Sequence, residues 1–277
     1  MEKSQLRHQI TQRIQNGCNI KLLGDSLTAG SGSSDSDLSG RVIYPPFRRQ
    51  RGKRCWASLL GAHLSARYGC SVDNVGCYGT TSGELMEHLD TLYQPATDRV
   101  VFCMIGANDK KLENGLEQLR SNLEALCAKV TGDSNSLVLM TPNPATAAND
   151  AKPNRFYTQA EVIRQTAGQW EGQVLFIDHF AAMMEDCRSR GLSLEDYLEV
   201  GAGPENDGLH PGDQVYRFYF ETIRSPYYIN QADFVACHNP SRSPGHPARR
   251  HCSAAPLLIQ RHNVRGLQPR DRKERLH

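Results

Sequence analysis

Serine, histidine and aspartate stand in this sequence at spacings that could support acyl transfer. That chemistry needs a nucleophile, a base, a group that orients the base, and donors for the negative oxygen of the intermediate. Ser26 follows the apolar run NIKLL within GDSLTAGSG, and Asp207 precedes His210 by three residues in NDGLHPGD. In a turn, such a carboxylate can reach the ring, fix the Nδ1 proton and leave Nε2 to accept the serine proton.

Candidate oxyanion donors occur in two further segments. NVGCYG, residues 74–79, carries glycines at 76 and 79, which let the backbone approach a ligand closely. IGANDKK carries Asn108, whose neutral amide can donate to negative charge without losing a proton. The N–H of Ser26 itself is a third donor if the serine begins a helical turn.

Each pattern also has a plainer interpretation. Ser26 lies in a serine-rich stretch in which a turn serine is ordinary, and the glycines fit any turn between strand and helix. Asn108 and Asp109 suit a helix cap. Asp207 and His210 suit a turn or a metal site, but neither an H-x-x-x-H pattern nor a clustered third ligand supports metal binding. Only the joint occurrence of the four blocks favours catalysis.

Alternating apolar and helical patterns predict the elements that position these residues. Strands are expected at NIKLL, SVDNVG, DRVVFCMIG, SLVLMTPNP and QVLFIDHF. Helices are expected at residues 5–16, 55–69, 82–93, 112–130, 158–170 and 211–223. This alternation predicts βαβ units and a mainly parallel sheet covered on both faces. Ligands of such sheets bind beyond the carboxyl ends of the strands, where Ser26 is expected.

The four blocks in this order resemble those of the SGNH, or GDSL, hydrolase superfamily. The GDSL block is residues 24–27, the G-x-N-D block is residues 106–109, and the D-x-x-H block is residues 207–210. Gly79, five residues after Asn74, best matches the oxyanion glycine of the family. The resemblance extends over about residues 19–224. The absence of G-x-S-x-G around Ser26 argues against the α/β-hydrolase fold.

The resemblance implies a three-layer α/β/α sandwich, flavodoxin-like, with about five mainly parallel strands. It implies that Ser26 is the nucleophile and that His210 is the base, oriented by Asp207. It assigns the oxyanion hole and the supporting aspartates to the following residues: Ser26, Gly79 and Asn108 as donors, and Asp25 and Asp109 as structural groups. Tyr78 stands where the family usually has a serine, and the loop after the GDSL block is long.

The function that the resemblance implies is hydrolysis of a carboxylic ester through an acyl-enzyme, without a cofactor or metal. The polar loop from Gly30 to Lys53 favours a short acyl group on a polar carrier, such as a sugar O-acetyl ester. The alternatives are a lipase or thioesterase acting on longer chains and a non-catalytic binding module on the same scaffold. The expected partner is a small-molecule or carbohydrate ester, and nothing in the sequence indicates an oligomeric state.

Composition limits the remaining possibilities. Residues 241–277 contain eight Arg and one Lys against one Asp and one Glu, a net charge of +7, so the preceding 240 residues carry −5. The basic character belongs to the tail and does not indicate a nucleic-acid partner. The chain has no apolar run of 18 residues, so no membrane span is expected.

The expected organisation is an N-terminal helix in residues 1–18, a hydrolase domain in residues 19–228 and a poorly ordered basic tail in residues 229–277. The N-terminus lacks a signal-peptide pattern, and the nine scattered cysteines form no C-x-x-C pair. These features predict reduced thiols and a cytoplasmic location. The serines at 31, 33 and 34 are expected in a flexible loop.

Overall fold

The computed structural model describes residues 2–36, 52–109, 112–146, 156–198 and 207–225. The chain divides into a unit of residues 1–238 and a unit of residues 239–277, and every described residue belongs to the first. The predicted tail and most of the basic loop after residue 36 lie outside the described residues. Within the described part, none of the helices has the length and apolar character that crossing a bilayer requires.

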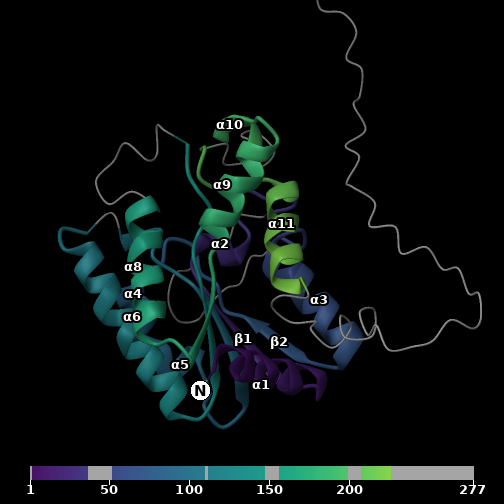
Figure 1. Ribbon diagram of the computed structural model, residues 1–277, viewed down its shortest axis with the longest axis vertical. Helices are drawn as coiled ribbons and strands as arrows, with labels where there is room; N and C mark the ends of the chain where they lie inside the picture. Colours follow the sequence, from purple (N-terminus) through teal and green to yellow (C-terminus); the bar gives the residue numbers. More distant parts are fainter. Residues whose placement is uncertain (1, 37–51, 110–111, 147–155, 199–206, 226–277) are drawn as a thin grey trace, which may run out of the picture. The chain divides into compact units, whose positions relative to one another are not determined.

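A five-stranded parallel sheet forms the centre of the described unit (Figure 1). Its order is β2-β1-β3-β4-β5, and each neighbouring pair is parallel. The strands are β1 (Asn19–Gly24), β2 (Ser71–Asn74), β3 (Asp98–Met104), β4 (Ser136–Met140) and β5 (Val174–Ile177). The predicted flavodoxin-like sandwich of about five parallel strands is confirmed.

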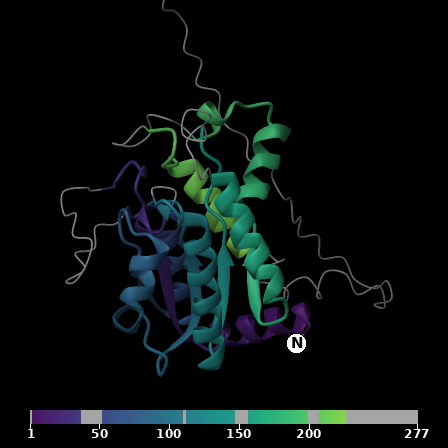
Figure 2. The same ribbon diagram turned by 90° about the vertical axis from the view of Figure 1, so that its left-hand side faces the viewer.

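Helices cover both faces of this sheet. They are α1 (Lys3–Gln15), α2 (Ser26–Ala29), α3 (Trp56–Tyr68), α4 (Ser82–Glu87), α5 (Leu89–Leu92), α6 (Gly115–Gly132), α8 (Phe156–Gln169), α9 (His179–Ser189), α10 (Leu194–Tyr197) and α11 (Asp213–Arg224). One apolar cluster joins the sheet to α1, α3, α9 and α11. The second joins it to α4, α5, α6 and most of α8. Figure 2 shows the teal helices α6 and α8 in front of the strands.

The strand sequences explain why both faces are covered. In β3, Val100, Phe102 and Met104 belong to the first cluster. Val101 and Cys103, between them, belong to the second. Successive strand side chains point to opposite faces, so a continuous apolar run requires packing on both sides.

The pairing register brings the carboxyl ends of the first three strands together. Gly24 at the end of β1 pairs with Met104 at the end of β3. Leu22 of β1 pairs with Asn74 at the end of β2. The segments that follow these strands therefore leave the sheet at one edge, and they carry the serine, the glycines and Asn108.

Candidate active site

Ser26 lies at the turn between β1 and α2. Asp25 caps α2, because its Oδ1 accepts a hydrogen bond from the Leu27 N–H at 3.0 Å. Gly24 is required by space, since a Cβ there would lie 2.3 Å from the backbone oxygen of Met104. The turn thus places Ser26 as the first residue of the helix, with its side chain directed to the His210 ring.

A chain of hydrogen bonds joins Ser26, His210 and Asp207. The Ser26 Oγ lies 2.8 Å from His210 Nε2, and His210 Nδ1 lies 2.8 Å from Asp207 Oδ2. A carboxylate only accepts hydrogen bonds, so Nδ1 carries the proton and Nε2 can accept the serine proton. The three residues that the sequence nominated are therefore brought together in the order that proton transfer requires.

The environment of Asp207 keeps its carboxylate ionised. Partial burial opposes ionisation, but the hydrogen bond and charge of His210 and two backbone N–H groups hold its pKa well below the ordinary value. Those N–H groups belong to Leu209 and His210 and donate to Oδ1 at 3.0 and 2.9 Å. One oxygen of Asp207 therefore fixes the loop, and the other orients the ring.

Asn143, three residues after the end of β4, holds the loop that carries Asp207 and His210. Its Nδ2 donates to the Leu209 oxygen at 3.0 Å, and its Oδ1 accepts from the Tyr219 hydroxyl at 3.0 Å. The Thr146 N–H also donates to the Gly208 oxygen at 3.0 Å. The sequence reasoning missed Asn143, which it placed within the expected strand SLVLMTPNP; a polar residue between two prolines at the end of that segment was a usable signal.

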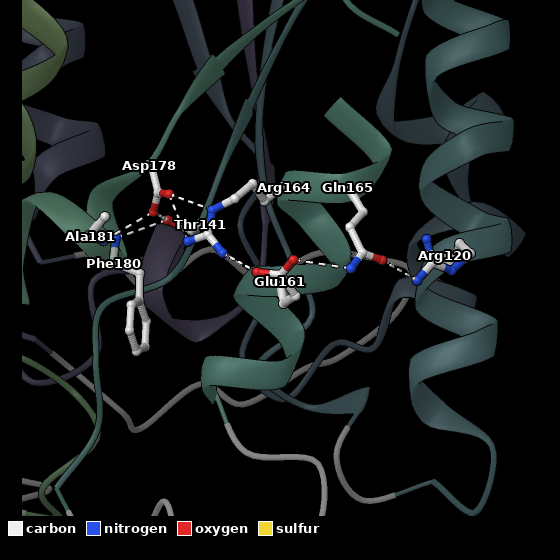
Figure 3. Close-up of polar contacts among 8 residues, drawn as sticks. All are labelled: Arg120, Thr141, Glu161, Arg164, Gln165, Asp178, Phe180 and Ala181. Atoms are coloured by element: carbon white, nitrogen blue, oxygen red, sulfur yellow. Dashed lines mark hydrogen bonds and ion pairs between the residues drawn. The ribbon is translucent and has the colours of Figure 1, made fainter. Parts of the chain in front are cut away.

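A polar network fixes the ends of β4 and β5 beside this segment (Figure 3). Thr141 Oγ1 donates to Asp178 at 3.2 Å and accepts from the Phe180 N–H at 2.9 Å. Arg164 donates to the same carboxylate through Nε at 2.9 Å and Nη2 at 2.7 Å. The network continues along the helices through three side chains, Glu161, Gln165 and Arg120. It anchors the strand end from which Asn143 emerges.

On the other side of Ser26, the loops after β2 and β3 are joined. Asn108 Nδ2 donates to the Thr80 oxygen at 3.0 Å. Asp109 accepts from the Ser82 N–H at 3.0 Å and from its hydroxyl. Gly79, in the loop after β2, has φ +79°, a conformation that favours glycine. These bonds bring the predicted donors Gly79 and Asn108 into adjoining loops.

Asn74 connects the glycine loop to the nucleophile turn. Its Nδ2 donates to the Thr28 oxygen at 2.9 Å, and its Oδ1 accepts from the Gly76 N–H at 2.8 Å. A Cβ on Gly76 would lie 2.7 Å from the backbone nitrogen of Ala29. The expected close approach of Gly76 is therefore to the α2 backbone and not to a ligand. In the sequence, Asn74 served only to locate Gly79, and its hydrogen bonds to the nucleophile turn and the glycine loop were not predicted.

Asp25 is buried beneath the site. Burial raises its pKa to about 6, against the lowering effects of the Leu27 N–H and of His210. Burial also raises the pKa of Asp109, despite the hydrogen bonds from Ser82. The nearby Asp109 carboxyl also raises the pKa of Asp25. Both predicted supporting aspartates are fully buried and accept hydrogen bonds from the loops that carry the polar groups of the site.

The expectation of a flexible serine loop is wrong for residues 31–34. Ser31 and Ser33 are buried, and the Ser31 oxygen accepts a hydrogen bond from the Tyr216 hydroxyl. Ser34 donates to Asp213 through its N–H at 2.8 Å and its hydroxyl at 2.7 Å. Contacts with α11, far along the chain, order these residues, which local composition cannot reveal.

The described residues offer no cluster of three or more histidine, cysteine, aspartate or glutamate side chains arranged to hold a metal ion.

Comparison with solved structures identifies similar folds. An acetylxylan esterase from Geobacillus stearothermophilus superposes with a TM-score of 0.58 at 20% identity, covering 76% of this chain and 95% of its own. Two further structures of that esterase are catalytic mutants, one with a serine and one with a histidine replaced by alanine. A lipase/acylhydrolase from Enterococcus faecalis gives a TM-score of 0.54 at 19% identity, covering 76% of this chain and 95% of its own.

By sequence, none of the curated proteins is a significant match to this chain. The model of the GDSL-like lipase/acylhydrolase family matches residues 22–218, more than half of the 277 residues. That span contains the GDSL turn, the two donor loops and the Asp207–His210 pair. The chain belongs to the GDSL-like lipase/acylhydrolase family and is a carboxylic ester hydrolase of the SGNH type.

Proposed function

We propose that Ser26 is the nucleophile of a two-step ester hydrolysis and that His210 and Asp207 activate it. The observation that carries this proposal is the hydrogen-bonded chain from the Ser26 hydroxyl through the imidazole to the carboxylate. Ser26 Oγ attacks the ester carbonyl carbon while its proton passes to His210 Nε2. Asp207 stays ionised, because its pKa is held low, and it stabilises the imidazolium that forms.

The tetrahedral intermediate carries a negative oxygen, for which we propose three donors. These are the N–H groups of Ser26 and Gly79 and the side-chain amide of Asn108. The Ser26 N–H lies at the start of α2, where the backbone N–H groups favour an anion. One N–H of Asn108 is directed to Thr80, which fixes the plane of the amide that supplies the second. Each such donor is worth about 10²- to 10³-fold in kcat.

Collapse of the intermediate breaks the bond to the leaving alcohol, which takes the proton from His210 Nε2. The acyl group remains on Ser26 as an ester. Water then attacks this ester while Nε2 removes its proton, and the same donors bind the second intermediate. The carboxylic acid leaves, and the proton returns to the Ser26 oxygen.

For the substrate, we propose a short-chain acyl ester, most specifically an O-acetyl group on a sugar. The Geobacillus neighbour is an acetyl-xylooligosaccharide esterase, and the sequence from Gly30 to Lys53 is rich in serine and arginine. The second candidate is a lipase or thioesterase for longer chains, in keeping with the Enterococcus neighbour.

Hydrolysis of p-nitrophenyl acetate by the wild type and the Ser26→Ala variant tests the mechanism. The wild type should release nitrophenol at least about 10³-fold faster than the variant. Ser34→Ala is the matched control, since its hydroxyl lies in the same segment but contacts Asp213; it should keep near wild-type activity. Equally slow release by the wild type and the Ser26 variant, on both acetate and palmitate esters, would contradict the assignment of Ser26 as the nucleophile.

A chain-length series tests the substrate. Rates on p-nitrophenyl esters from acetate to palmitate should fall as the chain lengthens, and acetylated xylooligosaccharides should be deacetylated. A preference for palmitate would contradict the short-chain assignment and support the lipase.

We propose a cytoplasmic location, supported by the use of cysteine in the core. Cys103 and Cys127 pack within the second apolar cluster, and burial raises the pKa of the Cys127 thiol to about 12. Protonated thiols of this kind pack as small apolar groups.

A further inference from the structure

Tyr78 stacks against the imidazole that the proposed mechanism uses. The rings of Tyr78 and His210 are stacked, with centroids 6.0 Å apart and planes inclined by 24°. The ring edges of His210 are directed elsewhere, with Nε2 toward Ser26 and Nδ1 toward Asp207. Tyr78 therefore meets the π face and leaves both nitrogen atoms to their partners.

The backbone around Tyr78 is fixed from both sides. The Cys77 N–H donates to the Gly24 oxygen at 3.0 Å, and the Thr80 N–H donates to the Cys77 oxygen at 3.4 Å, closing a turn over Tyr78 and Gly79. Gly24 directly precedes the nucleophile turn. The tyrosine is therefore held at a set position relative to Ser26 as well as to His210.

An aromatic face at this position has an electrostatic consequence. The face of a phenol ring is negative and attracts a cation within about 6 Å. In the proposed mechanism, His210 becomes cationic when it takes the proton of Ser26 and, in the second step, the proton of the attacking water. An interaction that strengthens when the imidazolium forms lowers the barrier, whereas one equal in both states does not.

Carboxylates in the described part of the chain also act on His210. Asp207 lies on its own loop, and Asp25 lies at the β1–α2 junction. Gly32, from the serine segment, adds no charge and leaves no room for a side chain, since a Cβ there would lie 2.8 Å from His210 Cβ. From the loop between β2 and α4, the group that meets His210 is the uncharged ring of Tyr78. Substitution of Tyr78 leaves both carboxylates in place, so its effect can be isolated.

We propose that Tyr78 is a positioning residue that stabilises the His210 imidazolium through its π face. This inference rests on the proposed function for its catalytic consequence, but its physical basis can be measured without turnover. The stabilisation comes from the ring face and not from the hydroxyl. Phenylalanine at position 78 should therefore preserve it, and an aliphatic side chain should not.

The test is a histidine titration by NMR in the Ser26→Ala background, with carbon-13 at the ring Cε1 position. The His210 signal is assigned by its loss in a His210→Asn variant. Tyr78→Leu should lower the midpoint of this titration by about half a pH unit, and Tyr78→Phe should keep it within about 0.2 unit. Tyr78→Trp, with the strongest π face, should hold or raise the midpoint. Tyr157→Leu, which removes an exposed tyrosine on α8, is the control and should change nothing.

In the active background, Tyr78→Leu should lower kcat about threefold with little change in KM, and Tyr78→Phe should restore it. An unchanged midpoint in Tyr78→Leu would overturn the inference. An equal fall in Tyr78→Phe would also overturn it, since the hydroxyl would then be the active part. If the wild type fails to hydrolyse esters but the midpoints follow this order, the proposed function fails and the ring interaction stands.

Discussion

Replacing Asp207 by asparagine perturbs the proposed mechanism at a single atom. Asp207 Oδ1 accepts from two backbone N–H groups, and Oδ2 accepts from His210 Nδ1. In the variant, the amide oxygen must stay with the two N–H donors, so the NH₂ group faces Nδ1. Nδ1 then has to accept, and the proton moves to Nε2. The imidazole is held in the tautomer that cannot take the serine proton.

The size of the effect follows from the geometry. An ion pair with charge centres about 4 Å apart is worth about 4 kcal/mol at an effective dielectric constant of about 20. Asp207 is 36% exposed at its side chain, so solvent reduces this to about half. The unfavourable tautomer adds about 1 to 1.5 kcal/mol for the hydrogen bond that must be broken. We expect kcat to fall about 10²- to 10³-fold.

Steady-state hydrolysis of p-nitrophenyl acetate measures kcat and KM, and nitrogen-15 NMR of the histidine ring reports the tautomer. KM should change little, and the free energy of unfolding should fall by no more than about 1 to 2 kcal/mol, because the loop bonds persist. Asp133→Asn, which breaks a similar pair with Lys129, is the control and should leave kcat intact. A kcat within about fivefold of wild type, or a proton still on Nδ1, would refute the reasoning.

Two further predictions concern the turn that carries Ser26. Gly24→Ala should lower the free energy of unfolding, measured by chemical denaturation, by about 2 to 3 kcal/mol, because the added Cβ would overlap the Met104 oxygen. The control is Gly168→Ala, at a helix position with open space around it, which should not destabilise the protein. Because the folded-state pKa of Asp25 is about 6 and its ordinary value is 3.8, the contribution of Asp25 to stability should fall as the pH rises through this window. Asp25→Asn removes that loss, so the variant should gain stability relative to wild type from about pH 4 to 6 in pH-dependent denaturation; a constant difference across this range would contradict the buried carboxylate.

The fold and the principal polar residues could be predicted because their signals are local. An apolar run such as NIKLL followed by glycine marks a buried strand and its end, and parallel strands place their ends at one edge. Ser26 and Asn108 both follow such ends. Asp207 and His210 are three residues apart, so one turn suffices to join them.

The supporting contacts could not be predicted because their partners are distant in the chain. Ser34 is ordered by Asp213, 179 residues away, and Asn143 meets Leu209 across 66 residues. Neither pairing leaves a periodic pattern in the sequence. Tyr78 and His210 are also far apart in the chain, so their stacking could not be predicted. From the sequence, Tyr78 could be recognised only as a departure from the family pattern.

Covalent labelling with a fluorophosphonate tests the assignment of the nucleophile most directly, since the reagent reacts with a serine that is activated by its neighbours. The tryptic peptide of residues 22–41 contains six serines, so fragment-ion mass spectrometry can distinguish Ser26 from its neighbours. We predict one adduct per chain, on Ser26, with none formed by Ser26→Ala and slow formation by His210→Ala. Labelling of another serine, or equal labelling of Ser26→Ala, would contradict the account.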